Sequence, residues 1–265
     1  MTILELYALA AATVGCIALL LWLLSVPLRD ASIIDMFWGP LFVAIAWVLL
    51  PASGSEFTAR SYFMTLLVTL WGLRLGYHLI ARNLGSGEDS RYQLWRKHGG
   101  SLWWLKTSYR VFALQGVLAL MVCTPIIAAF YQPAGFSLVN LIGAGIWAVG
   151  FTYELIADIQ LERYLKRKSN SDETDGVLDS GLWRYSRHPN YFGDALAWWG
   201  LGLLAFSPST WWALIGPAVM TAIFLGISNS VIERGLNKRR PKYAQYVANT
   251  SKFFPWPSRA RGAED

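Results

Sequence analysis

Charged residues are scarce in this chain. Only 15% of its 265 residues are Asp, Glu, Lys or Arg, whereas 54% are apolar. Soluble proteins contain roughly 25% charged residues, so this composition argues against a soluble globular domain. Cysteine is also rare, and Cys16 and Cys123 both lie in apolar runs. This excludes a disulfide framework, and no Cys or His spacing suggests a metal site.

Glycine-rich nucleotide motifs are missing as well. Gly143 and Gly145 lie within an apolar stretch rather than after a strand, and nothing resembles a P-loop. There is no linker rich in Ser, Thr or Pro, no repeat and no low-complexity segment, so we expect one integral-membrane domain over residues 1–265. The net charge of +6 does not indicate nucleic acid as a partner, because of where the basic residues lie.

Apolar stretches occupy most of the chain. A bilayer span needs roughly 17–25 residues, and the stretches predict an all-α, polytopic membrane protein with about seven transmembrane helices. The first stretch is too long and too weakly flanked by basic residues to be a cleaved signal peptide. The predicted spans are Leu4–Leu28, Met36–Leu50, Tyr62–Ile80, Val111–Tyr131, Leu138–Ala157, Tyr191–Phe206 and Trp211–Ile232.

The distribution of Lys and Arg predicts the orientation. With the N-terminus outside, the outer connections are residues 51–61, 132–137 and 207–210, and they contain a single basic residue, Arg60. The other 22 of the 23 Lys and Arg residues lie on the opposite side or in adjoining helix ends. The positive-inside rule therefore predicts a periplasmic N-terminus and a cytoplasmic C-terminus, in a multi-pass protein of the bacterial inner membrane. The run Lys238–Arg240 is expected to contact anionic lipid.

Several ionisable side chains lie inside the predicted spans or at their inner ends. A charge without a partner in hydrocarbon is costly, so such residues are usually functional. All fall in the cytoplasmic half, which predicts a polar cavity at that depth. The alternative is a set of interhelical ion pairs, such as Arg74 with Glu154. The residues concerned are Asp35, Arg74, Glu154, Asp158 and Asp194.

Cations and hydrogen-bond donors concentrate before the sixth predicted span. A helix N-terminus has free N–H groups and a positive dipole end, which suit phosphate or carboxylate, and Pro189 fits the first turn. A second polar segment, from Ala81 to Tyr92, lies on the same side of the membrane. We therefore predict a polyanionic nucleotide held by side chains. The donors that we assign are Arg82, Asn83, Arg184, Tyr185, Arg187, His188, Asn190 and Tyr191.

The run Arg187–Asp194, with Trp198-Trp199-Gly200 after it, resembles the C-terminal signature of the steroid 5-alpha-reductase family, in a signature region covering residues 176–257. The resemblance looks closest to the bacterial branch. Members are membrane enzymes that reduce a carbon–carbon double bond conjugated to a ketone, using NADPH bound on the cytoplasmic side. Further matching blocks are Asp35-x-x-Trp38-Gly39, Arg82-Asn83 with Glu88-Asp89-x-Arg91-Tyr92, and Tyr243-x-x-Tyr246 with Thr250, Phe254 and Pro255-Trp256.

The resemblance implies NADPH as cofactor and assigns residues to it. Family cofactor positions fall on Asp158, Gly181, Tyr185, Asn190, Gly193 and Asp194, and Arg74 matches a basic residue of the third span. With the donors above, the expected cofactor set is Arg74, Arg82, Asn83, Glu154, Asp158, Arg184, Tyr185, Arg187, His188, Asn190, Tyr191 and Asp194.

The resemblance also implies a catalytic acid. Asp35 falls near the acidic residue that polarises the substrate ketone, although the alternative is a structural anchor paired with an arginine such as Arg29. An ungapped alignment places Trp71 at the position of the tyrosine partner, so we assign Tyr77, with Tyr62 as a substitute or the acid acting alone. The expected substrate is a steroid-like or other lipophilic enone that enters from lipid, and no obligate protein partner is expected.

A second family also shares part of the pattern. Arg-His-Pro-x-Tyr followed by Glu233 and a Tyr-x-x-Tyr tail resembles isoprenylcysteine carboxyl methyltransferases, which bind S-adenosylmethionine. That pattern does not need Asp35, the segment before Tyr92, or Asp158, and this favours the reductase. A third reading, a lipid-binding or scaffolding protein, requires every buried polar residue to be structural.

Overall fold

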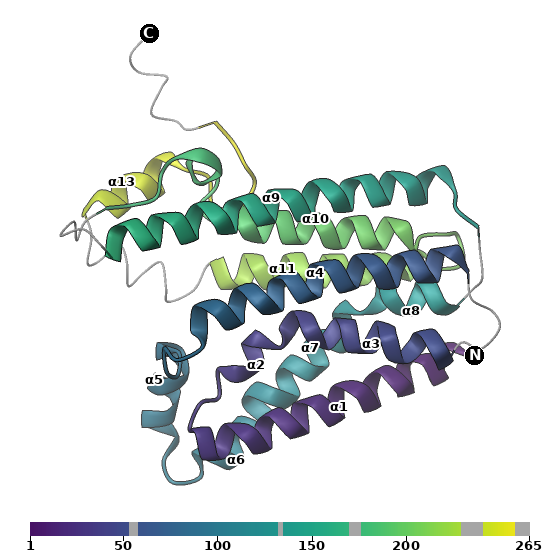
Figure 1. Ribbon diagram of the computed structural model, residues 1–265, viewed down its shortest axis with the longest axis horizontal. Helices are drawn as coiled ribbons and strands as arrows, with labels where there is room; N and C mark the ends of the chain where they lie inside the picture. Colours follow the sequence, from purple (N-terminus) through teal and green to yellow (C-terminus); the bar gives the residue numbers. More distant parts are fainter. Residues whose placement is uncertain (53–57, 132–134, 170–175, 229–240, 258–265) are drawn as a thin grey trace. The chain divides into compact units, whose positions relative to one another are not determined.

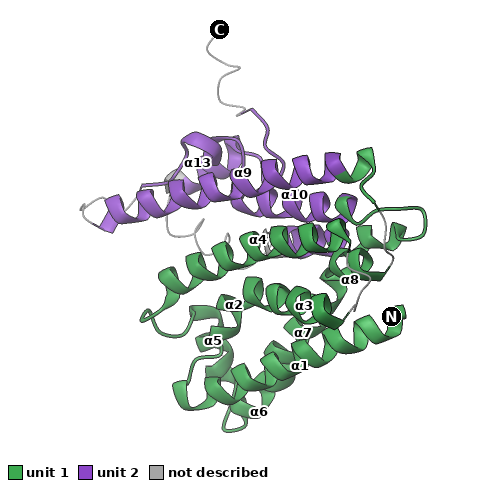
Figure 2. Cartoon of the chain, turned by 45° about the vertical axis from the view of Figure 1, so that its right-hand side comes forward, with its two compact units in different colours: residues 1–140, 204–216 green, residues 141–203, 217–265 purple. Residues whose placement is uncertain are grey.

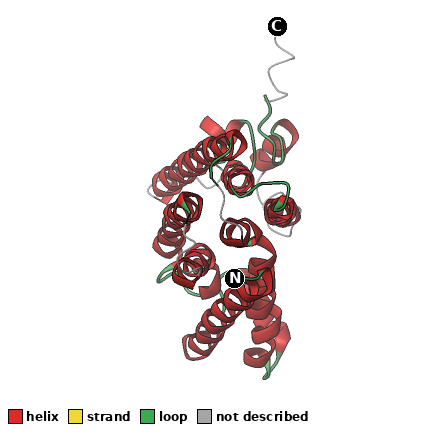
Figure 3. Ribbon diagram, turned by 90° about the vertical axis from the view of Figure 1, so that its right-hand side faces the viewer, coloured by secondary structure: helices red, strands yellow, loops and turns green. Residues whose placement is uncertain are grey.

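The computed structural model describes residues 1–52, 58–131, 135–169, 176–228 and 241–257, and within these ranges it contains helices and no strand (Figures 1 and 3). The all-α prediction is thereby confirmed. The chain forms two compact units (Figure 2): unit 1 comprises residues 1–140 and 204–216, and unit 2 comprises residues 141–203 and 217–265. Glu233 and the run Lys238–Arg240 lie outside the described residues.

Unit 1 is built around α1, α3, α4 and α8, which pack against one another. Helix α1 begins with a capping box between Thr2 and Glu5, in which two side chains satisfy free backbone N–H groups at the helix start. The elements are α1 (Ile3–Leu28), α2 (Ile33–Met36), α3 (Trp38–Ala52), α4 (Ala59–Asn83), α5 (Ser90–Gly99), α6 (Trp103–Thr107), the π-helix η1 (Ser108–Ala113), α7 (Leu114–Val122), α8 (Thr124–Tyr131) and the 3-10 helix η3 (Trp211–Leu214).

Glycines allow α3 and α4 to approach closely. A Cβ atom added at Gly39 would lie 2.4 Å from the carbonyl oxygen of Gly72, and one added at Gly76 would lie 2.7 Å from Cγ of Pro40. No side chain fits in these gaps, and small residues at helix contacts are typical of membrane helices. The sequence favours packing as the role of Gly72 and Gly76, and the geometry confirms this.

Unit 2 is organised by a similar crossing of α9 and α10. A Cβ atom at Gly193 would lie 2.5 Å from the backbone nitrogen of Glu154, and one at Gly200 would lie 2.4 Å from that of Trp147. This contact brings the start of α10 beside the middle of α9. The elements are α9 (Leu138–Ser169, whose first residues belong to unit 1), the 3-10 helix η2 (Gly181–Arg184), α10 (Pro189–Leu204), α11 (Ile215–Ser228, which begins in unit 1) and α13 (Pro241–Asn249).

Several helices are long and apolar enough to cross a membrane. Among the described residues these are α1, α4 and α9, with a fourth span if Trp103–Val122 and Thr124–Tyr131, bent by 46°, count as one. The bend falls at Cys123, where Pro125 cannot donate the backbone hydrogen bond that would continue α7. Helix α3 and the pair of η3 with α11 are shorter apolar helices. The count of seven spans and the orientation stay predictions.

A substitution at Gly72 tests the close crossing. We expect Gly72→Ala to lower the melting temperature of the detergent-solubilised protein, measured by tryptophan fluorescence, because overpacking costs about 1–3 kcal/mol. Gly15 on α1 is the matched control, since a Cβ atom there has no neighbour within 4 Å. Gly15→Ala is expected to leave the melting temperature unchanged or raised. Equal behaviour of the two variants would contradict the packing account.

Candidate functional site

Two elements of unit 1, α5 and α7, converge on the carboxyl group of Asp35 on α2. The hydroxyl of Tyr92 on α5 donates a hydrogen bond of 2.9 Å to Oδ1, and Nε2 of Gln115 on α7 donates one of 2.7 Å to the same oxygen. On the other oxygen, Oδ2, Asp35 accepts a bond of 3.3 Å from Nη2 of Arg91. We call Asp35, Arg91, Tyr92 and Gln115 the Asp35 cluster.

Local structure explains how these side chains are presented. Tyr92 lies in the first turn of α5, which is capped by Asp89 through the backbone N–H of Arg91. Gln115 is the second residue of α7, which follows directly after the π-helix η1. A π-helical turn contains an extra residue and is often found at functional sites, and it changes which face of the following α-helix a residue occupies. The π-helix therefore contributes to directing Gln115 at Asp35.

A second set of bonds holds α5 against the segment between α1 and α2. The carboxylate of Glu88 accepts two bonds from Arg96, of 2.9 and 2.8 Å, and a third of 2.9 Å from the backbone nitrogen of Ala31. The backbone nitrogen of Asp89 donates to the hydroxyl of Ser32 at 3.2 Å. Bidentate Arg–carboxylate pairs are strong and geometrically specific, and the Glu88 side chain is only 6% exposed. These bonds position the Asp35 cluster.

Burial sets the protonation of the cluster. Removal from water raises the pKa of the Asp35 carboxyl, an effect that the Gln115 hydrogen bond, the Arg91 charge and the Tyr92 hydrogen bond only partly offset. Burial and the neighbouring Asp35 likewise raise the pKa of Tyr92. The phenol is therefore neutral at physiological pH, and the carboxyl holds its proton to a higher pH than a free aspartate does. Both groups are suited to donating hydrogen bonds.

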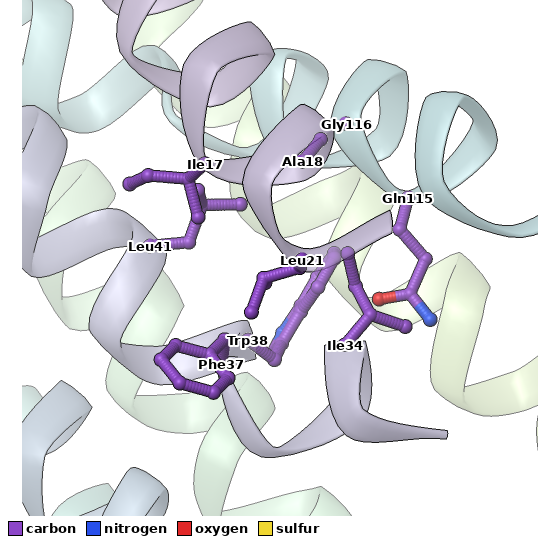
Figure 4. Close-up of a pocket in the computed structure, with 9 residues that line it drawn as sticks. All are labelled: Ile17, Ala18, Leu21, Ile34, Phe37, Trp38, Leu41, Gln115 and Gly116. Carbon is purple, nitrogen blue, oxygen red and sulfur yellow. The ribbon is translucent and has the colours of Figure 1, made fainter. Parts of the chain in front are cut away.

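A small apolar pocket adjoins the cluster in unit 1 (Figure 4). It encloses about 250 Å³ of empty space, part of it open to solvent. Gln115 belongs both to this wall and to the Asp35 cluster, so the pocket reaches the cluster through that side chain. The lining residues are Ile17, Ala18, Leu21, Ile34, Phe37, Trp38, Leu41, Gln115 and Gly116.

The structure differs from our assignment of the tyrosine partner. Tyr77 lies on α4 with 76% of its surface exposed, whereas the tyrosine that meets Asp35 is Tyr92, which is 5% exposed. Trp71, at the position implied by the ungapped alignment, is buried and packs against Phe42 in an edge-to-face contact. Trp71 is therefore a core residue.

Asp35 is paired with an arginine, as in the alternative of a structural anchor, but this arginine is not the one that we named. It is Arg91, whereas Arg29 ends α1 in a left-handed conformation. Both Arg91 and Tyr92 belong to a block that the sequence had already singled out for another role. The Asp35 cluster does not include Arg74, which is half-buried on α4, or Arg82 and Asn83 at the end of α4. Nε of Arg82 donates a hydrogen bond of 3.1 Å to Oδ1 of Asn83.

A second polar site lies in unit 2, where the turn before α10 is anchored on α9. The buried carboxylate of Asp158 accepts a bond of 3.2 Å from Nδ2 of Asn190, in the first turn of α10. Two residues further along α9, Oε1 of Gln160 accepts the backbone N–H of Leu182 at 3.0 Å. Asp158 and Asn190, both assigned to the cofactor from the sequence, are thus in direct contact. Gly181 has a positive φ of 60° and packs directly on the Gln160 side chain.

The C-terminal segment fastens the same turn from the other side. The hydroxyl of Tyr246 on α13 donates a hydrogen bond of 2.6 Å to the carbonyl oxygen of Trp183. The indole N–H of Trp183 in turn donates a hydrogen bond of 3.0 Å to the carbonyl oxygen of Ala157. The hydroxyl of Ser186 donates 2.8 Å to the carbonyl oxygen of Phe253. The signature residue Tyr246 therefore has a structural role in shaping this turn.

The cofactor residues expected in unit 2 gather around this turn. His188 and Tyr191 stack with ring centroids 5.3 Å apart, and Tyr191 stacks on Phe224 at 4.9 Å. The cationic side chains and the helix N-terminus fit phosphate groups. The aromatic rings beside them fit a heterocycle. The expected residues in this unit are Glu154, Asp158 and Asp194, which are buried, and Arg184, Tyr185, Arg187, His188, Asn190 and Tyr191, which are partly or largely exposed.

The Glu88 carboxylate is expected to fix α5. We predict that Glu88→Gln lowers the free energy of unfolding by about 1–3 kcal/mol, because Arg96 and Ala31 lose a charged acceptor. Hydrogen exchange of the backbone amides of residues 88–99 should accelerate. Glu162→Gln is the control, since its ion pair with Lys166 is exposed and such pairs contribute about 0–1 kcal/mol. Unchanged exchange in Glu88→Gln would show that this carboxylate does not position α5.

Comparison with known proteins identifies a relative and a family of this chain. A protein of Schizosaccharomyces pombe, described as uncharacterised, is 24% identical over 263 residues, which cover 89% of this chain and 75% of that protein. No solved structure matches the chain. Residues 21–250 match the model of a family described as a protein of unknown function, DUF1295. The chain therefore belongs to the DUF1295 family.

Proposed function

We propose that this protein is an NADPH-dependent membrane reductase of a carbon–carbon double bond conjugated to a ketone, in a steroid-like or other lipophilic substrate. One observation carries the proposal. A buried phenol, Tyr92, is hydrogen-bonded to a carboxyl of raised pKa, Asp35, beside an apolar pocket. An acid and a phenol held together in this way form a donor pair for a ketone oxygen.

The chemistry of the reaction explains the need for such a pair. When the double bond of an enone is reduced, negative charge develops on the ketone oxygen. When substrate binds, the Tyr92 hydroxyl exchanges its bond to Oδ1 of Asp35 for one to the ketone oxygen, and protonated Asp35 donates a second bond to that oxygen. Such hydrogen bonds are commonly the largest contribution to catalysis of this kind. Gln115 and Arg91 hold the carboxyl from both sides, so its direction is fixed before substrate arrives. The enolate then accepts a proton at the α carbon.

The turn before α10 would hold the cofactor. Arg184, Arg187 and His188, which precede α10, are suited to phosphate groups. Asn190, held by Asp158, has a fixed direction and would contact a polar edge of the nucleotide. NADPH, when bound, supplies the hydride that reaches the β carbon of the substrate.

We also propose that the apolar helices make seven crossings of the bacterial inner membrane, with the N-terminus in the periplasm. The support is the seven apolar stretches of the sequence, three or four of which form helices long enough to span a membrane among the described residues, together with the shortage of Lys and Arg on one side. This arrangement gives a lipophilic substrate access from the bilayer. The S-adenosylmethionine-dependent methyltransferase is less well supported, because methyl transfer has no evident use for the hydrogen-bonded pair of Asp35 and Tyr92.

Variants of the two tyrosines test the proposal. With an enone substrate and NADPH, we expect Tyr92→Phe and Asp35→Ala each to reduce turnover roughly 10²-fold, the usual cost of removing one oxyanion donor. Tyr77→Phe, at an exposed position of α4, is the control and should retain parental turnover. NADPH binding, followed by fluorescence, should survive in all three. Parental turnover in Tyr92→Phe would rule out the assigned donor pair.

The pH dependence of turnover provides an independent test. Since protonated Asp35 is the active form, turnover should fall as the pH rises through the pKa of Asp35, which burial places above that of a free aspartate. Arg91 lowers this pKa, so Arg91→Gln should move the falling limb to higher pH. Arg163→Gln, at an exposed position of α9, should leave it in place. A limb that stays fixed or moves to lower pH in Arg91→Gln would contradict this assignment.

A further inference from the structure

The polar groups that line the pocket are few and have different hydrogen-bonding capacities. Among the lining side chains, only Trp38 and Gln115 carry a polar atom. An indole N–H is a donor only, so the amide oxygen of Gln115 is the single side-chain acceptor of this wall. Every other lining side chain is apolar or glycine.

The orientation of the Gln115 amide follows from its partners. Its nitrogen donates 2.7 Å to Oδ1 of Asp35 and lies 3.4 Å from the hydroxyl of Tyr92. Oδ1 of Asp35 accepts hydrogen bonds, as it does from the Tyr92 hydroxyl. The amide nitrogen of Gln115, which is a donor, is therefore the end that faces Asp35. The oxygen Oε1 then points the other way, and Figure 4 shows it on the side of Leu21 and Trp38.

We propose that Oε1 of Gln115 selects a pocket ligand that carries a hydroxyl group on an apolar skeleton. The hydroxyl of such a ligand donates a hydrogen bond to Oε1. A purely hydrocarbon ligand instead removes water from Oε1 and offers no partner, so the oxygen is desolvated without compensation. An ether or ester oxygen at the same place faces another acceptor and is disfavoured. The pocket thus discriminates by hydrogen-bond donor as well as by shape.

The size and position of the pocket define the ligand further. The pocket is narrow, and this favours an open chain over a fused ring system. If the ligand is the enone of the proposed function, on which this step rests, its ketone meets Tyr92 and Asp35 while its hydroxyl meets Gln115. Since one amide contacts both the cluster and the pocket, the hydroxyl lies only a few bonds from the enone. An open-chain γ-hydroxy enone meets these requirements.

Two ketones that differ by one hydroxyl test the inference. We expect the wild-type protein to reduce 5-hydroxy-3-nonen-2-one with a kcat/KM about 5–100-fold above that for 3-nonen-2-one, the range expected for one satisfied acceptor. Gln115→Met keeps a similar size without the amide, and in this variant the ratio should fall to about 1 because the acceptor is absent. Tyr92→Phe is the control: it should slow both reactions and keep the wild-type ratio.

Equal kcat/KM values for the two ketones in the wild type, or a ratio that survives in Gln115→Met, would overturn the inference and leave the proposed function standing. If neither ketone is reduced, the proposed function fails, and thermal stabilisation by nonan-1-ol and by its methyl ether decides the inference alone. The alcohol should stabilise the wild type more than the ether does, and this difference should vanish in Gln115→Met. Equal stabilisation of the wild type by both compounds would overturn the inference.

Discussion

The carboxyl group of Asp35 is the point at which α2, α5 and α7 are joined. Helix α2 has four residues and no side-chain cap, and so short a helix is not stable by itself. The hydrogen bonds from Tyr92 and Gln115, together with the Glu88–Arg96 pair beside them, hold it in place. The same packing keeps the carboxyl partly buried, and this burial raises the pKa of Asp35, on which the proposed chemistry depends, more than the hydrogen bonds lower it. In this account, the Asp35 carboxyl both joins the three helices and supplies the acid of the proposed reaction.

Glycine contacts constrain each unit separately. At Gly72 in unit 1 and Gly193 in unit 2, the backbone of the facing helix occupies the space of a side chain. The second contact bears on the interpretation of the signature, because it gives Gly193 a packing role where the family resemblance implied a cofactor role. It also brings Asn190 within hydrogen-bonding distance of Asp158. In this unit, close helix packing and the arrangement of the polar site have the same origin.

The long apolar helices were predictable from the sequence, because the thickness of a bilayer determines how long an apolar run must be to span it. The bend at Cys123 was not, because an apolar composition continues through it. Asp158 was predictable as an acid at the end of an apolar run, and Asn190 as part of the run Arg187–Asp194. Tyr92 was missed because it lies 57 residues after Asp35 on a polar helix. Gln115, 80 residues away, is an uncharged residue in an apolar run, and only tertiary packing reveals its partner.

The central claim is that hydride transfer to an enone is assisted by Tyr92 and Asp35. The most direct measurement uses NADPH carrying deuterium at C4 of the nicotinamide, with the purified protein and an enone, followed by mass spectrometry of the product. The account predicts one deuterium at the β carbon of the saturated ketone, and the loss of this product in the double variant Asp35→Ala, Tyr92→Phe. Formation of the labelled product at an undiminished rate in that variant, or its absence with the parent protein, would contradict the account.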